Sequence, residues 1–137
     1  MSIEIACLCG DISVSLEGDP VTQIYCYCDD CQATHGAAYV GAALYPNDAV
    51  TVTKGTPVKW TYKTNTRSRC GTCGTILIMD PAGAPFKGVK ADRLPIGTFK
   101  PEFHIQCEYA ILPVVDSLPH FKAFPPQFGG SEETVDW

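Results

Sequence analysis

The chain contains the stretch Cys70-Gly71-Thr72-Cys73-Gly74-Thr75, in which two cysteines flank a glycine-containing turn. Glycine at the second and fifth positions allows positive backbone φ angles, so the chain can curl around an ion. The amides of such a turn can also point at thiolate sulfurs. We interpret this stretch as half of a zinc site, and the remaining ligands must come from elsewhere in the sequence.

Eight cysteines occur among the 137 residues, and the other six are also unevenly placed. They form a Cys-x-Cys-Gly motif, a Cys-x-Cys-x-x-Cys motif and one isolated residue, namely Cys7 and Cys9, then Cys26, Cys28 and Cys31, then Cys107. The N-terminal residues include Glu4 and no basic, apolar leader, so we expect a cytoplasmic protein. In a reducing compartment, closely spaced cysteines favour metal sites over disulfides, although disulfides remain the alternative.

The simplest partition of these sulfurs predicts two Zn2+ per chain. One is a structural zinc with four ligands, Cys7, Cys9, Cys70 and Cys73. The other is a second, open zinc with three ligands, Cys26, Cys28 and Cys31. Closed four-ligand sites hold structure, whereas three protein ligands and an exchangeable position are typical of a zinc that activates a ligand.

Spacing alone leaves other arrangements open. Cys26 and Cys28 can instead be paired with Cys70 and Cys73. Cys107, His35 or His104 could close the second site and make both zinc ions structural. For Cys107 the simpler interpretation is a buried free thiol in a strand.

Length and patterning predict a single, mainly β domain. Alternating apolar residues indicate antiparallel strands near residues 12–16, 50–53, 58–62 and 76–78. Asp29 to His35 is the best candidate for one of one or two short helices, because its first residues are acidic. We assign residues 1–125 to a zinc-binding domain and residues 126–137 to a C-terminal tail.

Composition argues against two classes of partner. The formal net charge is -5 and the ten Lys and Arg residues are scattered, so nucleic-acid binding is not expected. Residues 36–45 form the longest mostly apolar run, well short of the roughly 18 residues that a membrane helix needs. The nearest approach to a basic patch is Lys63, Arg67 and Arg69, which could meet a ligand carboxylate or simply be a solvated strand end.

The motifs together resemble the glutathione-dependent formaldehyde-activating enzymes and their centromere-protein-V-like relatives. The resemblance rests on the opening Cys-x-Cys-Gly, on Cys-x-Cys-x-x-Cys with Gly36 five residues later, on Cys-x-x-Cys-Gly, and on His104 followed by Asp116-Ser-Leu-Pro119. One departure is Gln32, at a position where the family often has Arg or Lys.

That resemblance implies a β-tent fold (Mss4-like), the same four-sulfur partition, and a catalytic zinc on Cys26, Cys28 and Cys31. It also implies carbon–sulfur lyase activity that interconverts S-hydroxymethylglutathione with glutathione and formaldehyde, so the expected partners are a small thiol and an aldehyde. A non-catalytic, zinc-stabilised binding module with both metals structural is the alternative, since function does not follow from fold.

Overall fold

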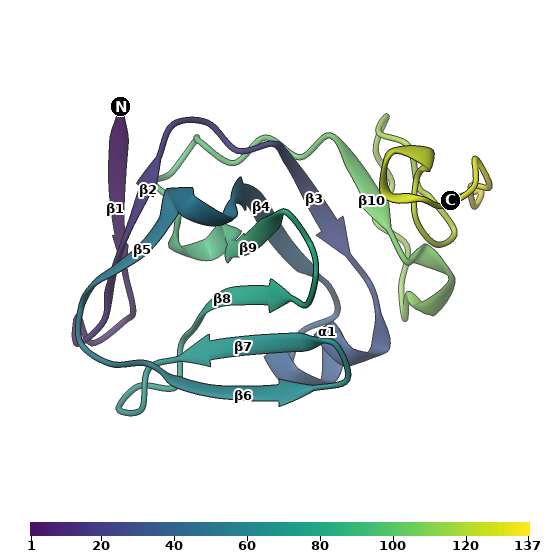
Figure 1. Ribbon diagram of the computed structural model, residues 1–137. Helices are drawn as coiled ribbons and strands as arrows, with labels where there is room; N and C mark the ends of the chain where they lie inside the picture. Colours follow the sequence, from purple (N-terminus) through teal and green to yellow (C-terminus); the bar gives the residue numbers. More distant parts are fainter. The chain divides into compact units, whose positions relative to one another are not determined.

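A computed structural model describes all residues, 1–137, as a mainly β protein with two sheets and one short α-helix (Figure 1). The strands are β1 (Ser2–Ala6), β2 (Ser13–Glu17), β3 (Thr22–Cys26), β4 (Val40–Pro46), β5 (Val50–Lys54), β6 (Val58–Tyr62), β7 (Asn65–Arg69), β8 (Ile76–Pro81), β9 (Phe86–Lys90) and β10 (Phe103–Ile105). The helices are α1 (Asp29–His35) and the 3-10 turns η1 (Asn47–Ala49), η2 (Ala91–Arg93), η3 (Cys107–Tyr109) and η4 (Pro126–Phe128). The predicted fold class is confirmed.

The chain divides into two compact units. Unit 1 comprises residues 1–22 and 43–99, and unit 2 comprises residues 23–42 and 100–137. The longest helix, α1, has seven residues, and no helix meets the length and hydropathy that a membrane span requires.

Unit 1 contains the antiparallel three-stranded sheet β1-β2-β5 and a run of strands in the order β4-β9-β8-β7-β6, to which β4 contributes residues 43–46. Figure 1 shows β6, β7 and β8 lying side by side. Period-2 patterning explains β2, where Val14 and Leu16 are buried and the residues between them are not. In β8 the first four residues are all buried, so this strand is covered on both faces rather than on one as the alternation predicted.

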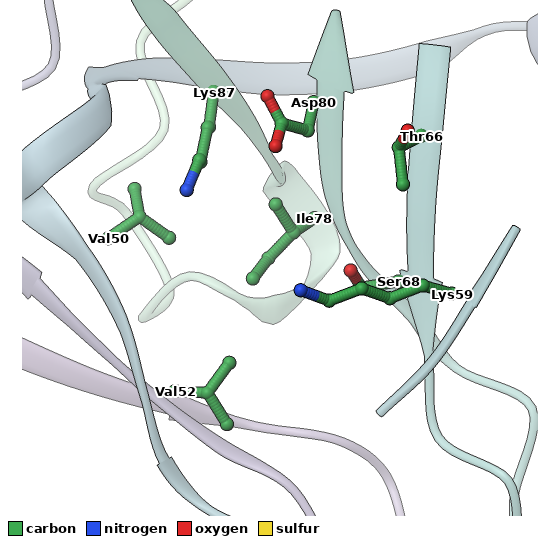
Figure 2. Close-up of a pocket in the computed structure, with 8 residues that line it drawn as sticks. All are labelled: Val50, Val52, Lys59, Thr66, Ser68, Ile78, Asp80 and Lys87. Atoms are coloured by element: carbon green, nitrogen blue, oxygen red, sulfur yellow. The ribbon is translucent and has the colours of Figure 1, made fainter. Parts of the chain in front are cut away.

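A small cavity of about 60 Å³ opens in unit 1 among residues of β5 to β9 (Figure 2). Its walls include Thr66 and Ser68 of β7 together with Lys59 of β6 and Asp80 of β8. Since Thr66 and Ser68 are two residues apart on one strand, they define one face of β7. The residue between them, Arg67, belongs to the opposite face.

Unit 2 is organised around β3 and β10, which pair in parallel with Phe103 opposite Ile24 and Ile105 opposite Cys26. This pair is an exception to the antiparallel pattern expected from the sequence. Beyond β10, an isolated bridge joins His104 to His120, and another joins Phe121 to Thr134. In this pairing His104 lies opposite Tyr25, the residue directly before Cys26.

Candidate metal centres

Four cysteines of unit 1 come together at the ends of strands that are far apart in sequence. Cys7 and Cys9 follow β1, and Cys70 and Cys73 lie between β7 and β8. The Sγ atoms of Cys7 and Cys9 are 3.7 Å apart, those of Cys9 and Cys70 are 3.6 Å apart, and all four sulfurs lie within 4.8 Å of one another. Tetrahedral zinc with Zn–S bonds of about 2.3 Å requires sulfurs about 3.8 Å apart, so this set fits zinc.

Backbone amides in both turns point at these sulfurs. The N–H of Ile12 donates to Cys7 Sγ at 3.3 Å, and the N–H groups of Thr72 and Cys73 donate to Cys70 Sγ at 3.4 and 3.5 Å. Hydrogen bonds to the charged form of a group favour that form. The turn geometry therefore prepares the thiols to bind a cation as thiolates.

The pKa values of the four thiols are spread widely. A hydrogen bond from the Thr75 hydroxyl, with backbone hydrogen bonds, lowers the pKa of Cys73 to about 5. The Asp11 amide favours the thiolate of Cys9, but burial and the neighbouring sulfurs outweigh it and raise the pKa of Cys9 to about 12. Four thiolates this close repel one another, so they cannot all form at neutral pH unless a cation compensates their negative charge. A bound metal ion would supply that positive charge.

Three cysteines of unit 2 form a second cluster at the end of β3 and the start of α1. Cys31 Sγ lies 3.7 Å from Cys26 Sγ, and Cys28 is the N-cap of α1, where its Sγ accepts the N–H of Cys31 at 3.2 Å. The hydrogen bonds of Cys28 and Cys31 raise the pKa of the Cys26 thiol well above its usual value. The spacing and donor chemistry again fit zinc, with three sulfurs instead of four.

The residues considered as a fourth ligand do not join this cluster. Cys107 and His35 belong to the same unit. Neither the Sγ atom of Cys107 nor a ring nitrogen of His35 is part of the group of ligand atoms that lie within 4.8 Å of one another. Cys107 is 3% exposed, and burial raises the pKa of its thiol to about 12. Its surroundings suit an inert buried thiol rather than a nucleophile.

Gln32 of α1 is held by the backbone around the second cluster. Its side-chain Nε2 donates to the carbonyl of Tyr27 at 2.7 Å and to the carbonyl of Tyr109 at 2.8 Å. Both amide protons are therefore used within the protein. The Gln32 side chain therefore fixes the loop between Cys26 and Cys28.

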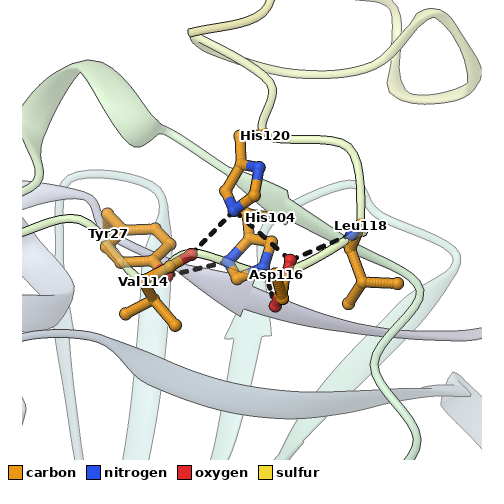
Figure 3. A network of polar contacts seen from close by, with 6 residues as sticks. All are labelled: Tyr27, His104, Val114, Asp116, Leu118 and His120. Atoms are coloured by element: carbon orange, nitrogen blue, oxygen red, sulfur yellow. Dashed lines mark hydrogen bonds and ion pairs between the residues drawn. The ribbon is translucent and has the colours of Figure 1, made fainter. Parts of the chain in front are cut away.

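A third group of polar residues in unit 2 surrounds the buried imidazole of His104 (Figure 3). The His104 Nε2–H donates to Asp116 Oδ2 at 2.8 Å, and the Tyr27 hydroxyl donates to His104 Nδ1 at 2.7 Å. His120 stacks on His104 with ring centroids 4.1 Å apart, and its Nε2 donates to the carbonyl of Val114 at 2.8 Å. Sequence reasoning assigned no role to His120, because only the return of the chain beside β10 brings it here.

Burial and hydrogen bonding set the charge states of this group in opposite directions. Burial lowers the pKa of His104 although Asp116 partly offsets it. Burial tends to raise the pKa of Asp116, but hydrogen bonds from His104 and the Leu118 amide lower it overall. Asp116 is therefore ionised and accepts only, which fixes the His104 proton on Nε2 and leaves Nδ1 to accept from Tyr27.

Fold and clusters together define a mainly β protein with two cysteine clusters that could each hold zinc. Residues 2–111, more than half of the chain, match the glutathione-dependent formaldehyde-activating enzyme family, and the protein belongs to that family. A crystal structure of a Rhodobacter sphaeroides protein from a structural-genomics programme is similar in fold, with a TM-score of 0.58. The two are 19% identical over 72% of this chain and 92% of the other. No curated protein gave a significant match.

Proposed function

We propose that the protein is a zinc-dependent carbon–sulfur lyase that acts on a thiol–aldehyde adduct such as S-hydroxymethylglutathione. The observation that carries this proposal is the cluster of Cys26, Cys28 and Cys31, which offers three sulfurs to an ion that takes four ligands. The family supports glutathione and formaldehyde as the products. A cytoplasmic location is part of the proposal, because closely spaced cysteines that bind metal are typical of a reducing compartment.

The reaction needs a good sulfur leaving group and a place for one proton. In the direction of release the carbon–sulfur bond breaks, both bonding electrons stay on sulfur, and the hydroxyl oxygen loses its proton to water as it becomes the formaldehyde carbonyl. A zinc ion held by the three cysteines would supply a Lewis acid that stabilises the departing thiolate. Because Cys107 is buried with a raised pKa, we assign it no part in the proton transfer.

The contribution of the surrounding residues is to hold the three sulfurs in place. Gln32 binds the carbonyl of Tyr27, which lies between two of the ligands, and the Tyr27 hydroxyl is anchored to His104. Tyr27 is fully buried, so the loop has little freedom to relax. Ligands fixed in this way keep a metal site rigid and leave its exchangeable position to an incoming thiol.

The direct test is metal content combined with a spectroscopic titration. Wild-type protein should contain two zinc ions per chain, and the Co2+-substituted form should change its thiolate charge-transfer spectrum when glutathione is added. Cys28→Ser should lose one zinc ion and the lyase activity. Cys107→Ser, the matched control, should keep two zinc ions and the lyase activity. A single metal in the wild type, or no spectral response and no activity, would contradict the proposal.

The second candidate is a non-catalytic, zinc-stabilised binding module with both metals structural. The use of Gln32 to bind two backbone carbonyls favours it, because this uncharged side chain is committed to the backbone and cannot attract an anionic thiol. If the protein holds two tightly bound metal ions and the Co2+ spectrum does not change when a thiol is added, the binding module would be the function supported.

A further inference from the structure

Tyr27 lies between two of the three cysteines of the second cluster, and the protein holds it at each of its polar groups. Its N–H donates to the carbonyl of Ile105 at 3.1 Å, and its carbonyl accepts from Gln32 at 2.7 Å. Its hydroxyl donates to His104 (Figure 3). Tyr27 is fully buried. A residue that covers the Tyr27 ring therefore acts on the loop that carries the neighbouring ligands.

Trp137 is such a residue. Its ring meets the ring of Tyr27 edge to face, with centroids 5.2 Å apart and planes at 79°. Its ring centroid also lies 4.8 Å from that of His120 and 6.2 Å from that of His104. Aromatic rings at such separations attract one another beyond the effect of the area they bury. A single indole thus packs on Tyr27 and on the imidazole that accepts the Tyr27 hydroxyl.

The segment that carries Trp137 is held in place by its backbone. The N–H of Val135 donates to the carbonyl of His120 at 2.9 Å. Beside this bond, Phe121 and Thr134 form an antiparallel bridge. The segment lies beyond the residues that match the family, and both halves of the pairing belong to unit 2. The placement of Trp137 therefore follows from the pairing within this chain.

We propose that Trp137 is a positioning residue for the second zinc site and that it acts by packing on Tyr27. This role rests on the proposed function in one respect, that the second cluster binds zinc. A site with three protein ligands has fewer metal–sulfur bonds than a closed site, so its affinity depends more on how firmly the ligands are held. Loss of the indole would uncover Tyr27 and loosen the loop that joins Cys26 to Cys28.

The test is zinc release to a chromophoric chelator from protein loaded with two zinc ions. Groups that orient metal ligands from outside the coordination shell change metal affinity by roughly tenfold to a hundredfold, and we expect a loss of that size at the second cluster of Trp137→Ala. The four-sulfur cluster of the same molecule should hold its zinc as in the wild type, which shows that the variant is folded. Trp137→Phe keeps an aromatic ring and should restore most of the affinity.

Two further variants serve as references for this measurement. Trp60→Ala is the matched control, because Trp60 is the other tryptophan of the chain and lies on β6 of unit 1. It should leave zinc release from the second cluster unchanged. Cys28→Ser should keep only the zinc of the four-sulfur cluster, so it identifies which release belongs to which site.

Equal zinc affinity of the second cluster in Trp137→Ala and wild type would overturn the role of Trp137 and leave the proposed function standing. An equal loss of affinity at both clusters would also overturn it, because the indole would then support the fold as a whole. Zinc release is measured without substrate. Affinity that depends on Trp137 in a protein without lyase activity would therefore remove the proposed function and leave the positioning role. A wild-type protein that takes up a single zinc would remove both.

Discussion

At the scale of single residues, Tyr27, His104 and Asp116 form a chain of hydrogen bonds that starts between two candidate ligands. The sequence indicated His104 and Asp116 as part of a family-like pattern and gave no role to Tyr27. It could not show that they meet, because Tyr27 and His104 are separated by 77 residues and are joined by the β3–β10 pairing. The cysteine pairs were easier to predict, because their members are close in sequence. The contact between Cys9 and Cys70, in contrast, joins residues that are 61 positions apart.

The pKa of His104 gives a prediction about this chain. In an NMR titration His104 should change charge below the ordinary 6.5, because burial lowers its pKa. Asp116 opposes that effect, so Asp116→Asn should lower the pKa of His104 further. His104 titrating above 6.5, or moving upward in the variant, would contradict this picture.

The same shift has a consequence for stability. Since the unfolded chain binds a proton at His104 more readily than the folded chain, the folded state is favoured above pH 6.5 and loses this contribution as the pH falls through 6.5 toward the lowered value.

At the scale of elements, strands with a clean alternation were predictable, and strands that depend on partners were not. β6 coincides with its predicted alternation, and β2, β5 and β8 overlap theirs but extend beyond them by one to three residues. The helix α1 has the predicted bounds, beginning with two acidic residues and ending at His35, with Gly36 as its C-cap in the left-handed region. β10 has only three residues and pairs in parallel with a strand about 80 residues earlier, so no local period could reveal it. Its formation depends on long-range pairing.

The turn that follows β5 provides the prediction for this scale. Gly55 has φ +76°, and an added Cβ would collide with the backbone carbonyl oxygen of Asp11. Gly83 has the same φ, but nothing lies within 4 Å of an added Cβ. Gly83→Ala should therefore cost about 1 kcal/mol from the φ penalty alone, and Gly55→Ala at least about 2 kcal/mol more, measured by urea unfolding. Equal losses in the two variants would mean that the Asp11 contact is easily relieved.

At the scale of the whole molecule, each compact unit contains one of the two cysteine clusters. The four-sulfur cluster lies wholly in unit 1, where Cys7 and Cys70 are also part of the hydrophobic core. The three-sulfur cluster lies wholly in unit 2. A metal at the first cluster therefore joins distant parts of one core, while a metal at the second fixes a short segment between β3 and α1.

Loop-closure entropy turns this difference into a measurable quantity. A metal bridging Cys9 and Cys70 closes a loop over 61 residues of separation, whereas one bridging Cys26 and Cys31 spans a separation of five. The entropy of closing the longer loop differs by about 2 kcal/mol, so metal binding should stabilise the fold more at the first cluster by that amount. Cys70→Ser and Cys28→Ser should each lose one zinc, but Cys70→Ser should lower the free energy of unfolding by about 2 kcal/mol more.

Hydrogen exchange locates the effect within the chain. Cys70→Ser should speed amide exchange across β1, β2 and β8, and Cys28→Ser only around α1 and the end of β3. If Cys28→Ser destabilised the protein as much as Cys70→Ser and exposed the amides of unit 1, the two clusters would not have separate structural roles. The three-sulfur cluster would then be needed for the fold itself, which would favour the binding-module alternative over a reactive zinc.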